Sequence, residues 1–267
     1  MWFMQFSTGT LTDIASAFKR ISLVGALGWQ DVRQRYRRSA LGPFWLTISM
    51  GIMIGTIGLV FGKLFNSPMV EFLPFLAAGI ILWTFISSVV TEGCSEFVSA
   101  QGIIKQLPIP LFVHTLRMIW RNCIILFHNI IIFPVVLLVL GGSFNANVIF
   151  VVPGFLLLLV NLAWLGLMLG VVCARYRDLP QIVSSALQVL FYLTPIIWMP
   201  KLLPERAGSF ILDFNPVFHL IEVVRSPLLG QVPSFDNWLV STFLAVSGWV
   251  VAIFFYGRYR KRLPYWL

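Results

Sequence analysis

The chain has 267 residues, of which 58% are hydrophobic and 11% are charged, and it carries a net charge of +9. Soluble domains carry about 25% charged residues, so this composition excludes an ordinary soluble domain and indicates an integral membrane protein. The positive charge does not indicate nucleic-acid binding, because the basic residues cluster at the ends of apolar runs, where phosphate headgroups lie. We therefore expect membrane lipids, and no nucleic acid, as partners.

Residues 11–33 form the first predicted element. Apolar residues recur there every three or four positions, which predicts a helix, and Thr10 followed by Asp13 resembles an N-cap signal. The run is too polar to span a membrane, so we expect an amphipathic helix in the cytoplasmic interface. The pattern leaves open whether this helix is a plain membrane anchor or docks a partner.

A cluster of arginines follows directly, with Arg33, Arg35, Arg37 and Arg38 around Tyr36. Each arginine would cost about 2.5–3.5 kcal/mol at the bilayer centre, so the cluster fixes the start of the first membrane span. Guanidinium groups bind phosphate well, and the pattern leaves open whether they meet a substrate phosphate or only lipid headgroups.

Six apolar runs follow that are long enough to cross about 30 Å of hydrocarbon. The predicted spans are residues 43–62, 72–91, 118–140, 148–173, 180–199 and 238–256. None has a charge in its middle, and Arg121, about one turn inside the third span, can extend towards the headgroups. We expect an all-α polytopic membrane protein with a single transmembrane domain over residues 1–267.

The distribution of positive charge predicts the topology. Of the 19 lysines and arginines, those expected on the outer side are Lys63, Lys201, Arg206 and Arg225. The positive-inside rule therefore places both termini in the cytoplasm. The triplet Arg-Tyr-Arg recurs at 35–37, 175–177 and 258–260, each time at a predicted cytoplasmic boundary, where a tyrosine between two cations suits headgroup depth.

Two of the segments that connect the predicted spans have sequence patterns that predict their structure. Residues 92–107, on the cytoplasmic side, predict a short amphipathic helix that Pro108 and Pro110 terminate. Residues 204–230, on the outer side, are too short and too charged to span and predict a re-entrant segment. Within it, Asn215 and Pro216 suit the N-cap and first turn of a helix.

Two of the predicted spans carry stripes of a single residue kind. The first span has glycines at three- or four-residue spacing, which lets another helix approach closely: Gly51, Gly55, Gly58 and Gly62. The fifth span has a polar face that lipid would leave unpaired: Gln181, Ser184, Ser185, Gln188 and Tyr192. Hydrogen bonding between helices and the lining of a passage are both open for this face.

The sequence has no phosphate-binding loop and no HExxH or GxSxG motif. We predict no catalytic residue, no metal site and no cofactor in this chain, and the absence of a charge in mid-span disfavours ion-driven transport. Asp213, His219 and Glu222 form the one outward group of acids and imidazole, which keeps open a membrane-embedded enzyme of lipid or glycan metabolism.

Several motifs, taken in series, resemble one family. They are RYRRSALGPFW after the amphipathic helix, RYRDL before the fifth span, Thr194-Pro195-Ile196 at its end, and Asn215-Pro216 followed by Arg225. In this order they resemble the permease subunit of type-2 ATP-binding-cassette polysaccharide exporters, over essentially the whole chain. The similarity is greatest to O-antigen permeases, followed by capsule and teichoic-acid permeases.

The resemblance implies a homodimer in the bacterial inner membrane, served by two copies of a separate ATPase subunit that binds ATP and Mg. The implied substrate is an undecaprenyl-pyrophosphate-linked glycan, although a small-molecule exporter on the same plan stays open. Residues 92–107 would be the coupling helix. The implied roles are pyrophosphate uptake for Arg33, Arg35, Tyr36, Arg37 and Arg38; channel lining for Gln181, Ser185, Gln188 and Tyr192; ATPase coupling for Glu92, Glu96 and Lys105; and dimer packing for Gly51, Gly55, Gly58 and Gly62.

Overall fold

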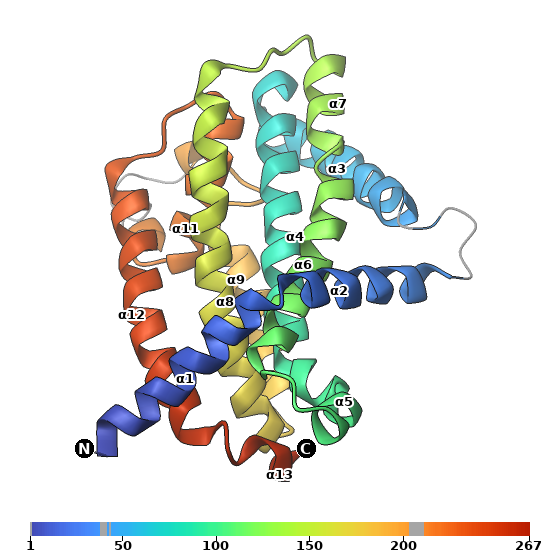
Figure 1. The fold of residues 1–267 in the computed structure, drawn as a ribbon. Coiled ribbons are helices and arrows are strands. Elements are labelled where there is room, and N and C mark those ends of the chain that lie inside the picture. The colour runs from blue at the N-terminus through green and yellow to red at the C-terminus, as the bar shows by residue number, and fades with distance from the viewer. Residues whose placement is uncertain (1, 38–41, 43, 203–210) are drawn as a thin grey trace.

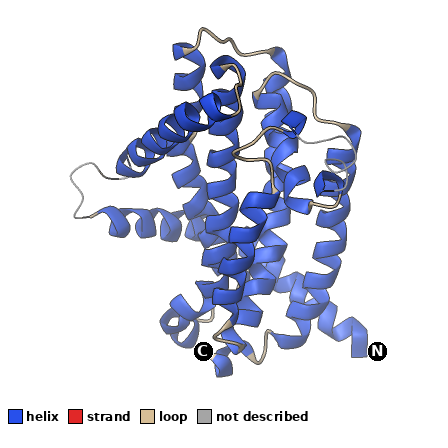
Figure 2. Cartoon of the chain, turned by 180° about the vertical axis from the view of Figure 1, so that it is seen from behind, coloured by secondary structure: helices blue, strands red, loops and turns tan. Residues whose placement is uncertain are grey.

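The computed structural model describes residues 2–37, 42, 44–202 and 211–267. Within these residues the chain consists of helices and loops, without a strand (Figures 1 and 2). The α-helices are α1 (Trp2–Lys19), α2 (Ile21–Tyr36), α3 (Phe44–Leu64), α4 (Met69–Ser99), α5 (Gln101–Gln106), α6 (Phe112–Asn129), α7 (Ile132–Val139), α8 (Val151–Arg175), α9 (Leu179–Leu193), α11 (Pro216–Leu228), α12 (Phe235–Tyr259) and α13 (Leu263–Trp266). Two short 3₁₀ helices are η1 (Ala146–Phe150) and η2 (Pro200–Leu202).

Five helical segments of the described chain are long and apolar enough to cross a membrane, which confirms the all-α polytopic fold. They are α3, α4 with α5, α6 with α7, η1 with α8, and α12. At 15 residues, α9 is about 22 Å long, shorter than the hydrocarbon core. It ends at Leu193 because Pro195 holds Thr194 in an extended conformation, so a complete span over residues 180–199 stays a prediction.

The helices α4, α8 and α12 stand side by side, with α8 in contact with the other two (Figure 1). Between α4 and α8 the backbones come close at two glycines, where a Cβ atom on Gly93 would lie 3.1 Å from Gly166 Cα. Elsewhere along these helices the core is filled by large apolar side chains, among them Phe72, Leu76 and Leu158. The helices that differ from the sequence prediction, α1, α2 and α5, pack on or continue the helices of this bundle.

The predicted interface helix over residues 11–33 is two helices, α1 and α2, which meet at Arg20. They separate because each follows a different partner: α1 packs on α12, and α2 lies across α6 (Figure 1). The proposed N-cap pair is wrong, since Thr10 and Asp13 lie inside α1. Asp13 instead accepts hydrogen bonds from the Phe112 N–H, 3.2 Å away, and the Tyr256 hydroxyl, 2.8 Å away.

The predicted coupling helix is also divided between two helices. Residues 92–99 continue α4, and only Gln101–Gln106 form the separate helix α5. The last turns of α4 stay in the bundle because Phe97 is fully buried, and Gly170 of α8 leaves it room. As a result α5 projects from the lower end of the molecule, near α13 and the C-terminus, with the N-terminus on the opposite side of the same end (Figure 1).

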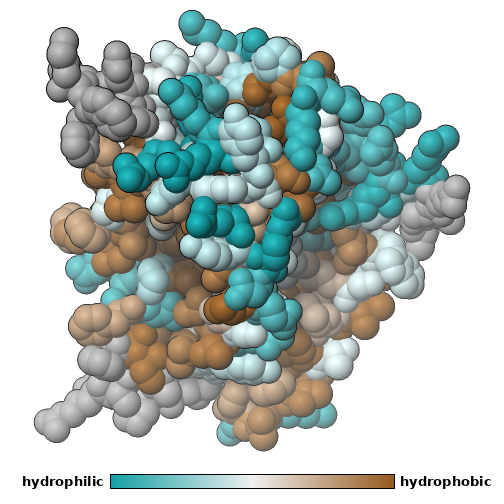
Figure 3. Space-filling view, turned by 90° about the horizontal axis from the view of Figure 1, so that it is seen from below, coloured by the Kyte–Doolittle hydropathy of each residue, from teal (hydrophilic) through white to brown (hydrophobic). Residues whose placement is uncertain are grey.

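Seen from this lower end, hydrophilic residues gather over the middle and one side of the face, and hydrophobic residues lie along the opposite edge (Figure 3). This is the predicted cytoplasmic end. At the other end, Asn215 caps α11 as predicted, because its side chain accepts from the N–H groups of Val217 and Phe218 at 3.0 and 3.2 Å. The first part of the predicted re-entrant segment lies outside the described residues.

Candidate functional site

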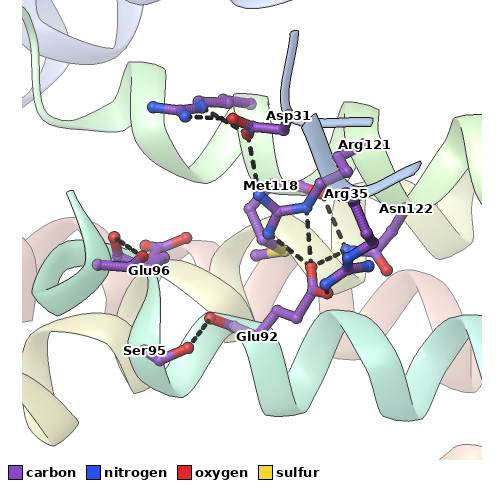
Figure 4. Close-up of polar contacts among 10 residues, drawn as sticks. Asp31, Arg35, Glu92, Ser95, Glu96, Met118, Arg121 and Asn122 are labelled. Carbon is purple, nitrogen blue, oxygen red and sulfur yellow. Dashed lines mark hydrogen bonds and ion pairs between the residues drawn. The ribbon is translucent and has the colours of Figure 1, made fainter. Parts of the chain in front are cut away.

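A cluster of charged side chains joins three helices at the level where α2 crosses the bundle (Figure 4). We call it the elbow network. Its members are Asp31 and Arg35 of α2, Glu92 of α4, and Arg117, Arg121 and Asn122 of α6.

Arg121 is the centre of the elbow network. Its Nη1 lies 2.9 Å from Asp31 Oδ2 and its Nη2 lies 2.6 Å from Glu92 Oε2, so one guanidinium joins both carboxylates. Arg35 closes the other oxygen of Glu92 at 3.0 Å, and Arg117 Nε donates to Asp31 at 2.7 Å. The expectation that Arg121 extends to the headgroups is therefore corrected, because this side chain is only 21% exposed and points inward to two acids.

The side chains of Glu92 and Glu96 are bound to other side chains of the bundle rather than free on its surface. Glu92 is held by Arg35, Arg121 and the Asn122 amide, and Glu96 is buried and accepts a hydrogen bond from the Thr115 hydroxyl at 2.8 Å. This differs from the predicted ATPase contact, and the reason is that α4 continues through both residues inside the bundle. Lys105, on α5, is exposed as that role requires.

The pKa of Asp31 shows how strongly the elbow network holds α2. Burial alone raises the pKa of this carboxyl, but hydrogen bonds and charges from Arg117 and Arg121 outweigh burial and hold it below its ordinary value of 3.8. A lowered folded-state pKa means that ionised Asp31 stabilises the fold above about pH 4, and that this stabilisation is lost as the pH falls through the lowered pKa.

We therefore expect the wild-type chain to unfold at a higher temperature than the Asp31→Asn variant at pH 6, and this difference to become smaller at pH 3. Thermal unfolding in detergent at the two pH values measures the difference directly. An equal difference at both values would show that the Asp31 carboxylate does not stabilise the contact between α2 and α6.

The structure divides the arginine cluster that was predicted to receive a pyrophosphate. Arg33 and Arg37 are exposed near the end of α2, and Tyr36 is half-buried. Arg35 is tied to Glu92 in the elbow network, whereas Arg38 lies outside the described residues. Arg33 and Arg37 are thus free to bind an anion, and Arg35 links this part of the chain to the bundle.

The polar face of α9 is uncovered. The exposed residues include all four that were predicted to line a channel: Gln181, Ser185, Gln188 and Tyr192. The opposite face of α9 is attached to α4, where the Phe191 and Trp83 rings lie 5.5 Å apart. No residue of α9 is buried, so this helix lies at the edge of a single chain.

Of the four glycines of α3, two face α4 and two face open space. Gly58 and Gly62 face α4, and a Cβ on Gly62 would lie 2.6 Å from Met69 Sδ. At Gly51 and Gly55 an added Cβ would meet open space. The predicted dimer packing can therefore use only the first two glycines, because the other two already bring α3 close to α4 within one chain.

A second ionic cluster, which the sequence reading missed, fixes the outer end of α9. Arg225 of α11 is fully buried, its Nε donates to Glu222 at 3.2 Å, and its guanidinium lies 4.0 Å from the centre of the Phe75 ring. It also donates to the Pro195 carbonyl, directly after α9. The spacing of Glu222 and Arg225 on one helical face is the sequence signal that could have revealed this pair.

Asp213, His219 and Glu222, the group considered for an embedded enzyme, do not converge on a shared site. The buried His219 ring contacts Asn237 at 2.8 Å and the backbone carbonyl of Asp213 at 3.0 Å. The carboxylate of Glu222 is bound to Arg225 and Ser226. The side chains of His219 and Glu222 thus have structural partners, and Asp213 meets His219 through its backbone carbonyl rather than its carboxylate.

Sequence relatives cover from about three quarters of the chain to nearly all of it. The O-antigen export system permease protein RfbA of Klebsiella pneumoniae is 21% identical over 260 residues, which are 97% of this chain and 96% of the relative. The protein of the same name from Myxococcus xanthus is 25% identical over 205 residues, 74% of this chain and 77% of its own. The polysialic acid transport protein KpsM of Escherichia coli is 24% identical over 246 residues, 90% and 93% of the two chains. Residues 22–229 of this chain match the ABC-2 type transporter family. Because the match covers more than half of the chain, the chain belongs to the ABC-2 type transporter family.

Proposed function

We propose that this chain is the permease subunit of an ATP-driven polysaccharide exporter. Its family makes it a membrane subunit of a transporter rather than an enzyme, and implies an ABC ATPase as partner. The names of its relatives refer to O-antigen and polysialic acid export. We propose that its substrate is a lipid-linked O-antigen polysaccharide, moved out of the cytoplasm across the inner membrane; capsular polysaccharide or teichoic acid is the alternative.

The uncovered polar face of α9 carries this proposal. Ser185 donates to the Gln181 carbonyl at 3.1 Å, but lipid would leave the side-chain amides of Gln181 and Gln188 without hydrogen-bond partners, so this face meets another protein surface or water. A second copy related by a two-fold axis places two such faces opposite each other, with a passage between them. Amide and hydroxyl groups there can exchange hydrogen bonds with sugar hydroxyls, and the exposed Tyr192 ring can contact sugar faces.

The elbow network suggests how ATP hydrolysis reaches the passage. A partner ATPase that moves α5 through Lys105 and its neighbours also moves α4, because the two helices meet at Ala100. Glu92 of α4 then carries the motion through Arg121 and Arg35 to α2. Arg33 lies on α2 and Arg37 directly follows it, where guanidinium groups suit the pyrophosphate of a lipid-linked substrate.

Cross-linking tests the arrangement of two copies. In a chain whose buried cysteines Cys94, Cys123 and Cys173 are replaced by alanine, Ser185→Cys should form a cross-linked dimer in membranes with a bifunctional thiol reagent that can span the passage. Thr242→Cys, also exposed but on α12, is the matched control and should stay monomeric. Equal cross-linking of the two variants, or none at Ser185→Cys, would contradict a homodimer in which α9 faces its copy.

A further inference from the structure

A pocket of about 340 Å³ lies where α8 and α12 end, beside α13. Its walls include Tyr176 from the second Arg-Tyr-Arg triplet and Tyr259 from the third. Two triplets that are far apart in the sequence thus meet at one place. Because α8 and α12 are both membrane-spanning candidates, we expect the lower boundary of the bilayer at their shared end.

The mouth of this pocket is positively charged. Arg175 and Arg262 line it and are both exposed, and none of the described residues that line it is acidic. Arg175 lies over two aromatic rings, with its Cζ 5.4 Å from the centre of Tyr176 and 5.1 Å from that of Trp266. Contact with two rings holds the guanidinium in place and leaves N–H groups able to donate to an anion.

The interior of the pocket has the opposite character. Val172 of α8 and Phe255 of α12 line it one turn further into the spanning segments. The pocket therefore changes from apolar to cationic along the direction from the hydrocarbon to the headgroups. This gradient fits a molecule with an acyl chain and an anionic phosphate, and fits neither a free ion nor a neutral lipid as well.

We propose that the pocket binds one anionic phospholipid of the surrounding bilayer. Arg175 and Arg262 hold its phosphate, and an acyl chain lies along Val172 and Phe255. The lipid bridges the ends of α8 and α12 and holds α13 against them. This site is separate from the α9 face and does not depend on which polysaccharide is exported.

The test is a lipid titration of the purified full chain in neutral detergent, followed by native mass spectrometry. The probes are dioctanoyl phosphatidylglycerol, dioctanoyl phosphatidylcholine and inorganic phosphate. We expect the phosphatidylglycerol to bind, and the double substitution Arg175→Gln with Arg262→Gln to weaken its binding roughly thirtyfold, which is about 2 kcal/mol, or about 1 kcal/mol for each basic residue near the headgroup.

The matched control is Arg258→Gln with Lys261→Gln, which removes the same charge from exposed positions outside the pocket. It should bind phosphatidylglycerol like wild type. Equal loss in the two double variants, or no loss in either, would overturn the proposal. Equal affinity for phosphatidylcholine would remove the anionic specificity, and equal affinity for inorganic phosphate would show a site for free anions.

A third variant keeps the proposal testable if removal of Arg175 disturbs α13. Val172→Phe retains both arginines but fills the apolar interior, so it should also weaken phosphatidylglycerol binding. Wild-type affinity in this variant would show that no acyl chain enters the pocket, and would overturn the proposed binding mode.

Discussion

Replacing Arg121 by Leu is expected to destabilise the isolated chain by about 2–3 kcal/mol, because two poorly exposed carboxylates lose the cation that they share and keep only Arg117 and Arg35 as ionic partners. Asp31 and Glu92 are only 12% and 20% exposed, so water cannot replace the guanidinium well. Thermal or denaturant unfolding of the permease in detergent, without any ATPase, measures this effect.

The control for this substitution is Arg33→Leu, which removes an equal charge from an exposed position on α2. It should change the free energy of unfolding by no more than about 0.5 kcal/mol. Combining Glu92→Gln with Arg121→Gln should cost less than the sum of the two single substitutions, because the pair interacts directly. Additive effects, or a stable Arg121→Leu variant, would contradict the internal role of the elbow network.

Much of the fold is predictable from the sequence because it depends on local physics. A run of about 20 apolar residues is sufficient to predict a membrane-spanning helix, and all five spanning segments of the structure overlap such runs. The cap of α11 was equally predictable, since Asn215 and Pro216 act on the residues directly after them.

The elbow network was not predictable, because its members are distant in sequence. Asp31 pairs with Arg117 and Arg121 across 86 and 90 residues, and no local pattern indicates which of several acids each arginine meets. A signal was nevertheless present: Arg121 lies inside an apolar run, and a charge in such a place needs a partner. The four-residue spacing of Glu92 and Glu96 likewise places them on one helical face, without indicating that α4 buries it.

The polar face of α9 and the glycines of α3 show what residue spacing can and cannot predict. The polar face of α9 was predicted from helical spacing, and the structure leaves its four residues exposed. The glycines of α3 were predicted as one stripe, but Gly58 and Gly62 pack on α4 while Gly51 and Gly55 stay open. Spacing identifies a close helix contact, and it cannot tell whether the neighbour belongs to the same chain or to another copy.

The second large effect is expected from Ser185→Trp, which places a bulky ring on the exposed face of α9. If this face lines the passage, the ring narrows it, and polysaccharide export should fall at least roughly tenfold, because pore diameter limits what passes. Thr242→Trp puts the same ring on an exposed position of α12 and should leave export unchanged. Normal export by the Ser185→Trp variant would show that the substrate does not pass α9.

The central claim is that this chain forms the passage while a partner ATPase supplies the energy. The most direct measurement is transport of lipid-linked polysaccharide in vesicles that contain the purified chain, with and without its ATPase and ATP. We predict transport only when ATPase and ATP are both present, and its loss in the Ser185→Trp variant. Uphill transport by the chain alone, without ATPase or nucleotide, would contradict the account.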